Sequence, residues 1–168
     1  MAATGLAAGA VVDCLDAAAI THVVTVPDTH QRTVLELIEE RGAPPVIRAA
    51  TEDDVLGICG GLWLGGARPV ALIQQLGIFA SVNALRGLVH DLSFPLAILA
   101  GMYGRETDRA VGASSKSAVR LCTPVLEALE IPWVLVEEPD QRALIVDTLR
   151  KPFAAGGAHV VLLGAPTT

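Results

Sequence analysis

Three carboxylates stand together ahead of a stretch rich in glycine and small residues. They are Glu52, Asp53 and Asp54. A carboxylate in a site that excludes water can exchange protons with a bound ligand. The same residues also suit a helix start, because Thr51 can accept a backbone N–H bond and acidic side chains complement the helix dipole. Judged on the local sequence alone, helix stabilisation accounts for all three carboxylates.

Two further groups of polar residues follow apolar runs. Gln74, Gly77 and Asn83 come after one such run, where these residue types are also typical of a simple turn. Asp28 and His30 follow an earlier run. An imidazole titrates near neutral pH and suits proton transfer, although a single histidine more often lies on the surface or caps a helix. Open α/β sheets bind ligands where strands end and helices begin, so these groups predict a site.

The elements that must position these residues follow from the apolar pattern. Short β-branched runs predict six strands, at 23–26, 46–50, 70–73, 96–100, 133–136 and 160–163. Helical spacing predicts helices at 6–20, 31–40, 52–64, 80–89, 117–129 and 140–150, with Thr29 as the cap of the second. We read 101–114 as a loop. This alternation requires right-handed crossovers and predicts an α/β fold: a doubly wound, mostly parallel, six-stranded sheet with helices on both faces.

Composition narrows the class of protein. With 168 residues, of which 52% are hydrophobic and 4% aromatic, the chain fits a single domain spanning 1–168. The formal charge of −6 and the scattered basic residues argue against nucleic-acid binding. Cys14, Cys59 and Cys122 lack metal-ligand spacing and are expected to be reduced, buried thiols. We identify no signal peptide or membrane span, and expect a cytoplasmic protein.

The order of several short motifs resembles a known family. The motifs run from Val23-Thr25-Val26-Pro27-Asp28 through Thr51-Glu52-Asp53-Asp54, Gly60-Gly61, Gly65-Gly66, Gln74, Gly77, Ser81 and Asn83-Ala84-Leu85 to Gly104-Arg105-Glu106 and Leu126-Glu127-Ala128-Leu129-Glu130-Ile131-Pro132. In this order they resemble the pyrimidine-binding domain of thiamine-diphosphate-dependent 2-oxoacid decarboxylases, a flavodoxin-like fold. The resemblance is greatest to alpha subunits of sulfopyruvate decarboxylase and to phosphonopyruvate decarboxylase.

The resemblance implies roles for individual residues. Glu52 matches the glutamate that bonds to the cofactor aminopyrimidine and promotes the tautomer able to take a proton. Pro27, Gln74, Gly77 and Asn83 match cofactor-binding positions, and Gly77 would allow close backbone approach.

The same family implies acid–base and substrate-binding groups in two loops. Asp28 and His30 lie in a loop that carries variable acid–base groups in this family. Arg105 and Tyr103 match a loop that binds substrate, where a guanidinium suits a sulfonate, phosphonate or carboxylate, although alternating charges such as Arg105-Glu106 are also typical of a solvated loop.

One departure and one absence limit these inferences. Gln75, Leu76 and Phe79 differ from the smaller or differently polar residues of the family, which leaves the substrate open. The chain contains no Gly-Asp-Gly, the motif that opens the Mg²⁺ and diphosphate site of such enzymes, and no Walker or GxGxxG loop. We therefore expect a Gly-Asp-Gly-containing beta subunit to hold Mg²⁺, in a heterotetramer or larger assembly acting on a small anionic 2-oxoacid. A carboligase, a phosphonopyruvate-type decarboxylase subunit and a non-catalytic flavodoxin-like binding module remain alternatives.

Overall fold

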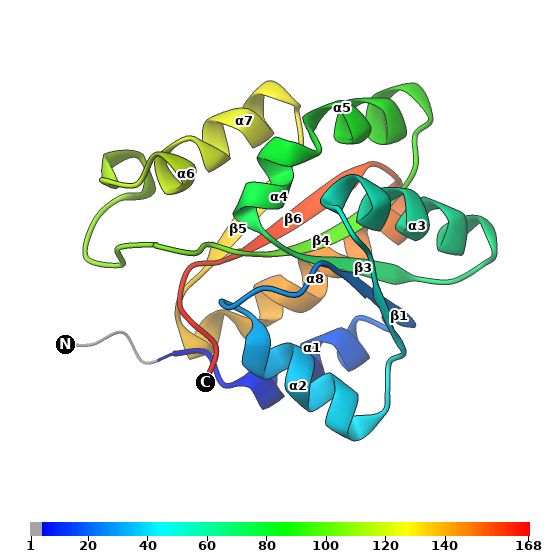
Figure 1. The fold of residues 1–168 in the computed structure, drawn as a ribbon, viewed down its shortest axis with the longest axis horizontal. Coiled ribbons are helices and arrows are strands. Elements are labelled where there is room, and N and C mark those ends of the chain that lie inside the picture. The colour runs from blue at the N-terminus through cyan, green and yellow to red at the C-terminus, as the bar shows by residue number, and fades with distance from the viewer. Residues whose placement is uncertain (1–4) are drawn as a thin grey trace.

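A computed structural model describes residues 5–168 as one six-stranded, all-parallel sheet (Figure 1). The strands are β1 (His22–Thr25), β2 (Val46–Arg48), β3 (Pro69–Gln74), β4 (Leu96–Gly101), β5 (Trp133–Val136) and β6 (Ala158–Leu163), in the order β2-β1-β3-β4-β6-β5. The doubly wound α/β prediction is confirmed, and the sheet is parallel throughout.

Helices cover both faces of the sheet. The α-helices are α1 (Ala8–Ala17), α2 (Arg32–Arg41), α3 (Glu52–Leu64), α4 (Gln75–Ala80), α5 (Val82–Leu85), α6 (Ser117–Arg120), α7 (Cys122–Ala128) and α8 (Arg142–Ala155). A π-helical segment, Arg86–Asp91, follows α5, and 3₁₀ turns occupy Val111–Ala113 and Pro139–Gln141. In Figure 1, α1, α2 and α8 lie below the sheet and α3 to α7 lie above it.

Alternate residues along the strands contribute to two hydrophobic cores, one on each face of the sheet. Val23 and Leu72 face α1, α2 and α8, whereas Val24 and Ile73 face the helices of the other side. Strands that are buried on both faces read as continuous apolar runs, which is why their positions could be predicted from sequence. No helix within residues 5–168 has the length and apolar character needed to cross a bilayer.

Several predicted boundaries were wrong in informative ways. The helix predicted to begin at Ala80 starts at Gln75, because β3 turns directly into α4 without a loop. The predicted helix 117–129 is two helices divided at Leu121. The last helix continues past Pro152 to Ala155, five residues beyond its predicted end at Arg150.

The predicted cap of α2 was also wrong. Asp28, not Thr29, serves the helix start: its Oδ1 accepts from the backbone N–H groups of His30 at 2.6 Å and Gln31 at 3.0 Å. A carboxylate is a stronger acceptor than a hydroxyl and it complements the positive end of the helix. For α3, the backbone N–H of Asp54 donates to Thr51 Oγ1 at 3.3 Å, as predicted.

Candidate functional site

The predicted site residues gather at the carboxyl edge of the sheet. The chain leaves β1 for α2 below the sheet, and leaves β2 and β3 for α3 and α4 above it (Figure 1). Neighbouring strands β1 and β3 thus send their connections to opposite faces. Such a divergence opens a crevice at the carboxyl ends of the strands, where ligands bind in open α/β sheets.

Glu52 and Gly77 meet across this edge. Glu52 is the first residue of α3, and its side chain lies over the backbone of Gly77 in α4. A Cβ atom added to Gly77 would lie 2.4 Å from Glu52 Cγ, too close for two carbon atoms, and 3.1 Å from Oε1, so the Glu52 side chain would have to move. Gly77 is buried and Glu52 is half-buried. The position therefore requires glycine so that the carboxylate can reach its place.

The Glu52 carboxylate has no hydrogen-bond or ion-pair partner anywhere in residues 5–168. Its oxygens are not among the side-chain atoms that are fully shielded from solvent. A half-buried carboxylate that is open to solvent and unpaired, at the ligand-binding edge of a sheet, is suited to bind a group from outside the chain.

Gln74, Asn83 and Pro27 lie around this contact at different depths. Gln74 ends β3, is half-buried and pairs in register with Gly101 of β4. Asn83 is exposed on α5, with its side-chain oxygen 3.4 Å from Arg86 Nε. Pro27 is exposed in the loop after β1. Pro27 thus follows β1 and Gln74 ends the neighbouring strand β3 at this edge, Asn83 lies on an upper helix, and Pro27 and Asn83 are the exposed members.

The β1–α2 loop holds His30 inside the fold. Its Nε2 lies 3.0 Å from the carbonyl oxygen of Leu163, at the end of β6, and its ring packs against Gly101. Burial lowers the pKa of His30, with a smaller opposing effect from the Asp28 carboxylate. At neutral pH the imidazole is therefore uncharged and donates to the Leu163 carbonyl.

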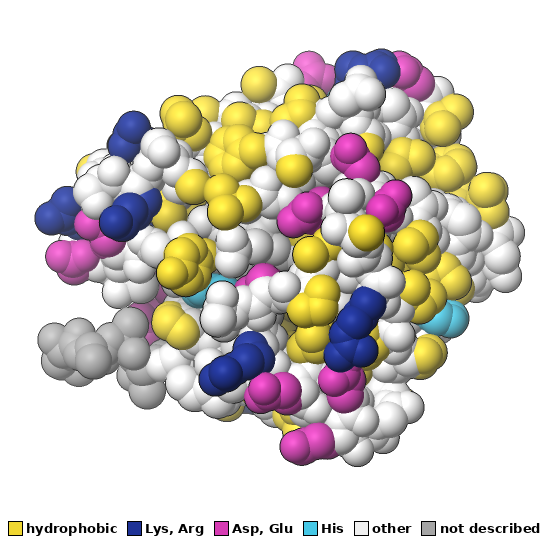
Figure 2. Space-filling view, in the orientation of Figure 1, with side chains coloured by type: hydrophobic (Ala, Val, Ile, Leu, Met, Phe, Trp, Pro, Cys, Tyr) yellow, Lys and Arg dark blue, Asp and Glu magenta, His cyan; other side chains and the backbone are white. Residues whose placement is uncertain are grey.

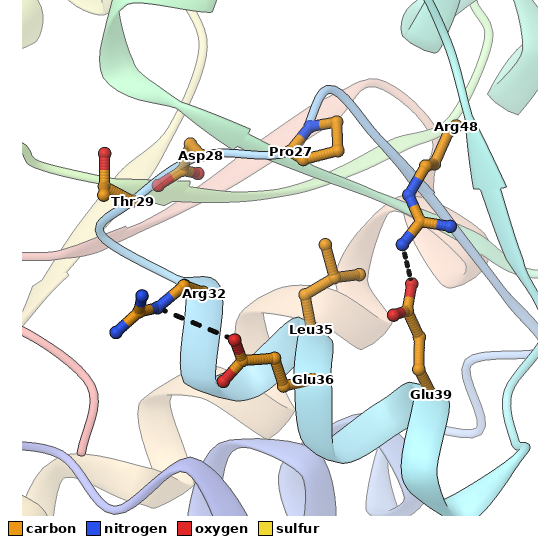
Figure 3. Close-up of a pocket in the computed structure, with 8 residues that line it drawn as sticks. All are labelled: Pro27, Asp28, Thr29, Arg32, Leu35, Glu36, Glu39 and Arg48. Atoms are coloured by element: carbon orange, nitrogen blue, oxygen red, sulfur yellow. Dashed lines mark hydrogen bonds and ion pairs between the residues drawn. The ribbon is translucent and has the colours of Figure 1, made fainter.

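A shallow cavity of about 490 Å³ adjoins the same loop (Figure 3). Pro27, Asp28 and Thr29 form its loop side, and side chains of α2 and β2 face them. Its two arginines are paired with glutamates: Arg32 with Glu36 at 3.7 Å, and Arg48 with Glu39. Exposed pairs of this kind contribute little stability.

Arg105 is largely buried and already paired. Its Nε lies 2.9 Å from Glu137 Oε1, and the Arg105 side chain is only 4% exposed. Glu137 itself lies over Gly164, where a Cβ would come within 2.4 Å of Oε1. The predicted substrate-binding arginine is thus engaged within the chain, whereas the Tyr103 side chain is exposed.

The loop after Arg105 is closed by Glu106. This carboxylate accepts from Ser114 Oγ, from Ser115 Oγ and from the backbone N–H of Ser115. These bonds, the one from Ser114 first, lower the pKa of Glu106 to about 2. The loop 102–116 therefore has a fixed internal shape despite its charged sequence.

The cysteines and metal-ligand types offer no further site among the residues described. Cys14, Cys59 and Cys122 are free and buried, as predicted, and burial raises the pKa of both Cys59 and Cys122 to about 12. Within residues 5–168, His, Cys, Asp and Glu side chains form no group of three able to hold a metal ion.

Comparison with known proteins relates the chain to decarboxylase subunits. The chain is 28% identical over 123 residues to the sulfopyruvate decarboxylase subunit alpha of Methanococcus maripaludis, a match that covers 73% of this chain and 72% of that subunit. The chain is a homologue of sulfopyruvate decarboxylase alpha subunits. The family resemblance inferred from the sequence is thereby confirmed.

Other decarboxylase homologues are longer than this chain. The match to sulfopyruvate decarboxylase of Methanosarcina acetivorans is 28% identical and covers 91% of this chain but 38% of that protein. Phosphonopyruvate decarboxylase of Streptomyces viridochromogenes is 24% identical, with 81% of this chain and 32% of that protein covered. This chain thus corresponds to about a third of each. No family model matches the chain.

A solved structure supports the fold. The 2-oxoglutarate:ferredoxin oxidoreductase of Magnetococcus marinus superposes on 92% of this chain and 28% of its own, with a TM-score of 0.66 and 14% sequence identity. At that identity the likeness concerns the arrangement of strands and helices alone.

Sequence reasoning missed three side chains that organise the edge. Gln31 and Gln75 are buried glutamines: Gln31 Nε2 donates to the Ile73 carbonyl at 2.7 Å, and Gln75 binds the backbone of Tyr103. Glu137 is the partner of Arg105. Gln75 was visible as a departure from the decarboxylase pattern, but its contacts join segments 28 residues apart and no local pattern reveals them.

Proposed function

We propose that this chain is the alpha, pyrimidine-binding subunit of a two-chain thiamine-diphosphate-dependent decarboxylase. Its substrate would be sulfopyruvate or a similar anionic 2-oxoacid. The observation that carries the proposal is the Glu52 carboxylate, held against Gly77 at the carboxyl edge without a partner in residues 5–168. The decarboxylase homologues supply the reaction class.

The edge residues fit the aminopyrimidine of that cofactor. A ring nitrogen needs a carboxyl oxygen at hydrogen-bond range, which Glu52 offers, and Gly77 leaves the room that the Glu52 side chain occupies. Bound thiamine diphosphate would supply the nucleophilic carbon and the electron sink for loss of CO₂. Glu52 would hold and return a proton at its carboxylate oxygen, and Gln74, Pro27 and Asn83 would orient the ring.

Substrate recognition is proposed for the loop beyond β4. Arg105 would release Glu137 and bind the second anionic group of the substrate in its place. The glutamate and the substrate group both present negatively charged oxygens to the guanidinium. Tyr103, with its exposed ring, would line the same space. Asp28 and His30 are proposed as acid–base groups of the β1–α2 loop. His30 would need to break its bond to Leu163 before it could protonate an intermediate.

A partner chain is part of this proposal. The beta subunit would carry Gly-Asp-Gly and hold Mg²⁺ and the diphosphate, most simply in a heterotetramer with two-fold symmetry. Several relatives are named as alpha subunits, which supports a chain that acts together with a partner subunit. Figure 2 shows hydrophobic side chains gathered over the upper helices, where Leu76, Phe79 and Leu121 line an apolar groove of about 250 Å³. Because Leu76 adjoins Gly77, we assign this groove to the beta subunit.

The test is reconstitution with that subunit. We expect CO₂ release from sulfopyruvate to require both chains, thiamine diphosphate and Mg²⁺, with phosphonopyruvate and pyruvate as comparison substrates. Ligation of the product to a second carbonyl compound would identify a carboligase instead. A reconstituted complex that binds the cofactor but releases no CO₂ from any of these acids would contradict the proposal.

A further inference from the structure

Gln75 joins the two parts of the candidate site. Its side chain is fully buried at the first position of α4, two residues before Gly77. Its Nε2 donates to the Tyr103 carbonyl at 2.7 Å, and its Oε1 accepts from the Tyr103 backbone N–H at 2.9 Å. One carboxamide thus satisfies both backbone groups of a single residue in the loop 102–116.

The reason lies in how the sheet ends. β3 and β4 pair in register as far as Gln74 and Gly101, and then β3 turns into a helix. The backbone of Tyr103 continues beyond the last strand pair and has lost its neighbour on that side. The Gln75 carboxamide replaces that neighbour, because its donor and acceptor match those of a peptide group.

This contact is one of the few that tie the loop to the rest of the fold, beside the Met102 N–H bond to the Leu163 carbonyl at 2.9 Å and the Arg120 bond to the Ser114 carbonyl at 2.9 Å. Met102 is fully buried, but the Tyr103 ring is exposed and does not anchor the chain. The Glu106 carboxylate binds Ser114, Ser115 and Arg109, which all belong to the same segment. Gln75 and the Glu137–Arg105 pair tie its beginning to the rest of the sheet edge.

We propose that Gln75 is a positioning residue that fixes the 102–116 loop relative to the Glu52–Gly77 contact and thereby sets substrate affinity. Gln75 is not among the residues assigned above to the cofactor or the substrate, and it acts through Tyr103 and the Arg105 that follows. The part concerning affinity rests on the proposed function, whereas the part concerning the loop does not. This assigns a physical role to a residue at which the chain departs from its decarboxylase family.

Hydrogen exchange, followed by mass spectrometry on the full chain, tests the loop part. Gln75→Leu keeps the volume and removes both bonds, so amides of 103–116 should exchange about tenfold faster or more while those of β4 stay protected. Gln75→Asn, which keeps the donor and the acceptor on a side chain one methylene shorter, should fall between and serves if Gln75→Leu does not fold. Thr148→Val, a buried change in α8 on the other face, is the control. Unchanged exchange in 103–116 would overturn the proposal.

Kinetics of the reconstituted complex test the affinity part. Gln75→Leu should raise KM for the 2-oxoacid several-fold and change kcat less, because a displaced loop weakens binding. General destabilisation would instead reduce the amount of active enzyme and leave KM unchanged. Faster exchange with wild-type KM and kcat would overturn the positioning role. If the wild-type complex decarboxylates nothing, the proposed function fails, and the exchange result still supports or overturns the loop contact.

Discussion

Glu52 and Arg105 both lie at the carboxyl edge of the sheet, but their charged groups have different surroundings. Arg105 is buried and paired with Glu137, and His30 in the neighbouring loop donates to a strand carbonyl. The Glu52 carboxylate, by contrast, lies against Gly77 and has no hydrogen-bond or ion-pair partner within residues 5–168. The fold already supplies partners for the first two groups, which a ligand would have to displace, and it leaves the third directly available to a ligand.

This difference separates structural from functional charges without reference to residue type. A charged group that the fold satisfies stabilises the chain, and its removal should cost stability. Removal of a group that the fold leaves without a partner should lower the activity and change the stability little. We test this division first with changes that should affect activity and then with changes that should affect stability.

Gly77→Ala should have the largest effect among them. The added Cβ would displace the Glu52 side chain, and a shift of about 1 Å in a reacting group can lower turnover on the order of 10²-fold. Gly57→Ala is the matched control: it lies in α3 with nothing within 4 Å of the added atom, and should keep full activity while stabilising the helix by about 0.5–1 kcal/mol. Equal activity in the two variants would contradict the contact.

Arg105→Ala should mainly affect stability. It leaves Glu137 unpaired at a largely buried position, which we expect to lower the free energy of unfolding by about 1–3 kcal/mol in a urea titration. Arg109→Ala removes an exposed arginine whose Nη1 lies 3.6 Å from Glu106 Oε1. This control should change the free energy of unfolding by less than about 0.5 kcal/mol. In the complex, Arg105→Ala should also raise KM more than it lowers kcat. Identical KM values would exclude Arg105 from the substrate site.

The pH dependence of stability should show the smallest effect. Burial holds the folded-state pKa of His30 below its ordinary value of 6.5, so below about pH 6.5 the unfolded chain takes up the proton first. Stability should therefore fall as pH drops from 6.5 toward the lower folded pKa, and be unaffected by this group above 6.5. His30→Gln keeps a donor for Leu163 and should show a smaller fall between pH 7.5 and 5.5, measured by urea midpoints. The same fall in both proteins would refute this account of His30.

The sequence predicted the sheet, most of the strands and the Glu52 position because buried parallel strands and a capped helix start have local patterns. It could not predict that α4 begins at Gln75, because the loss of a loop there depends on the contact of Gln75 with Tyr103, 28 residues away. The pairing of Arg105 with Glu137, separated by 32 residues, was hidden for the same reason. Local patterns place residues at the edge of the sheet, and long-range contacts decide which of them stay free.

The most direct test of the central claim is Glu52→Gln in the reconstituted complex. The change keeps the shape of the side chain and removes the exchangeable proton, so unfolding midpoint and assembly should match the wild type while decarboxylation falls on the order of 10²-fold or more. Wild-type turnover by the Glu52→Gln complex would contradict the assignment of Glu52 as the group that this chain contributes to catalysis.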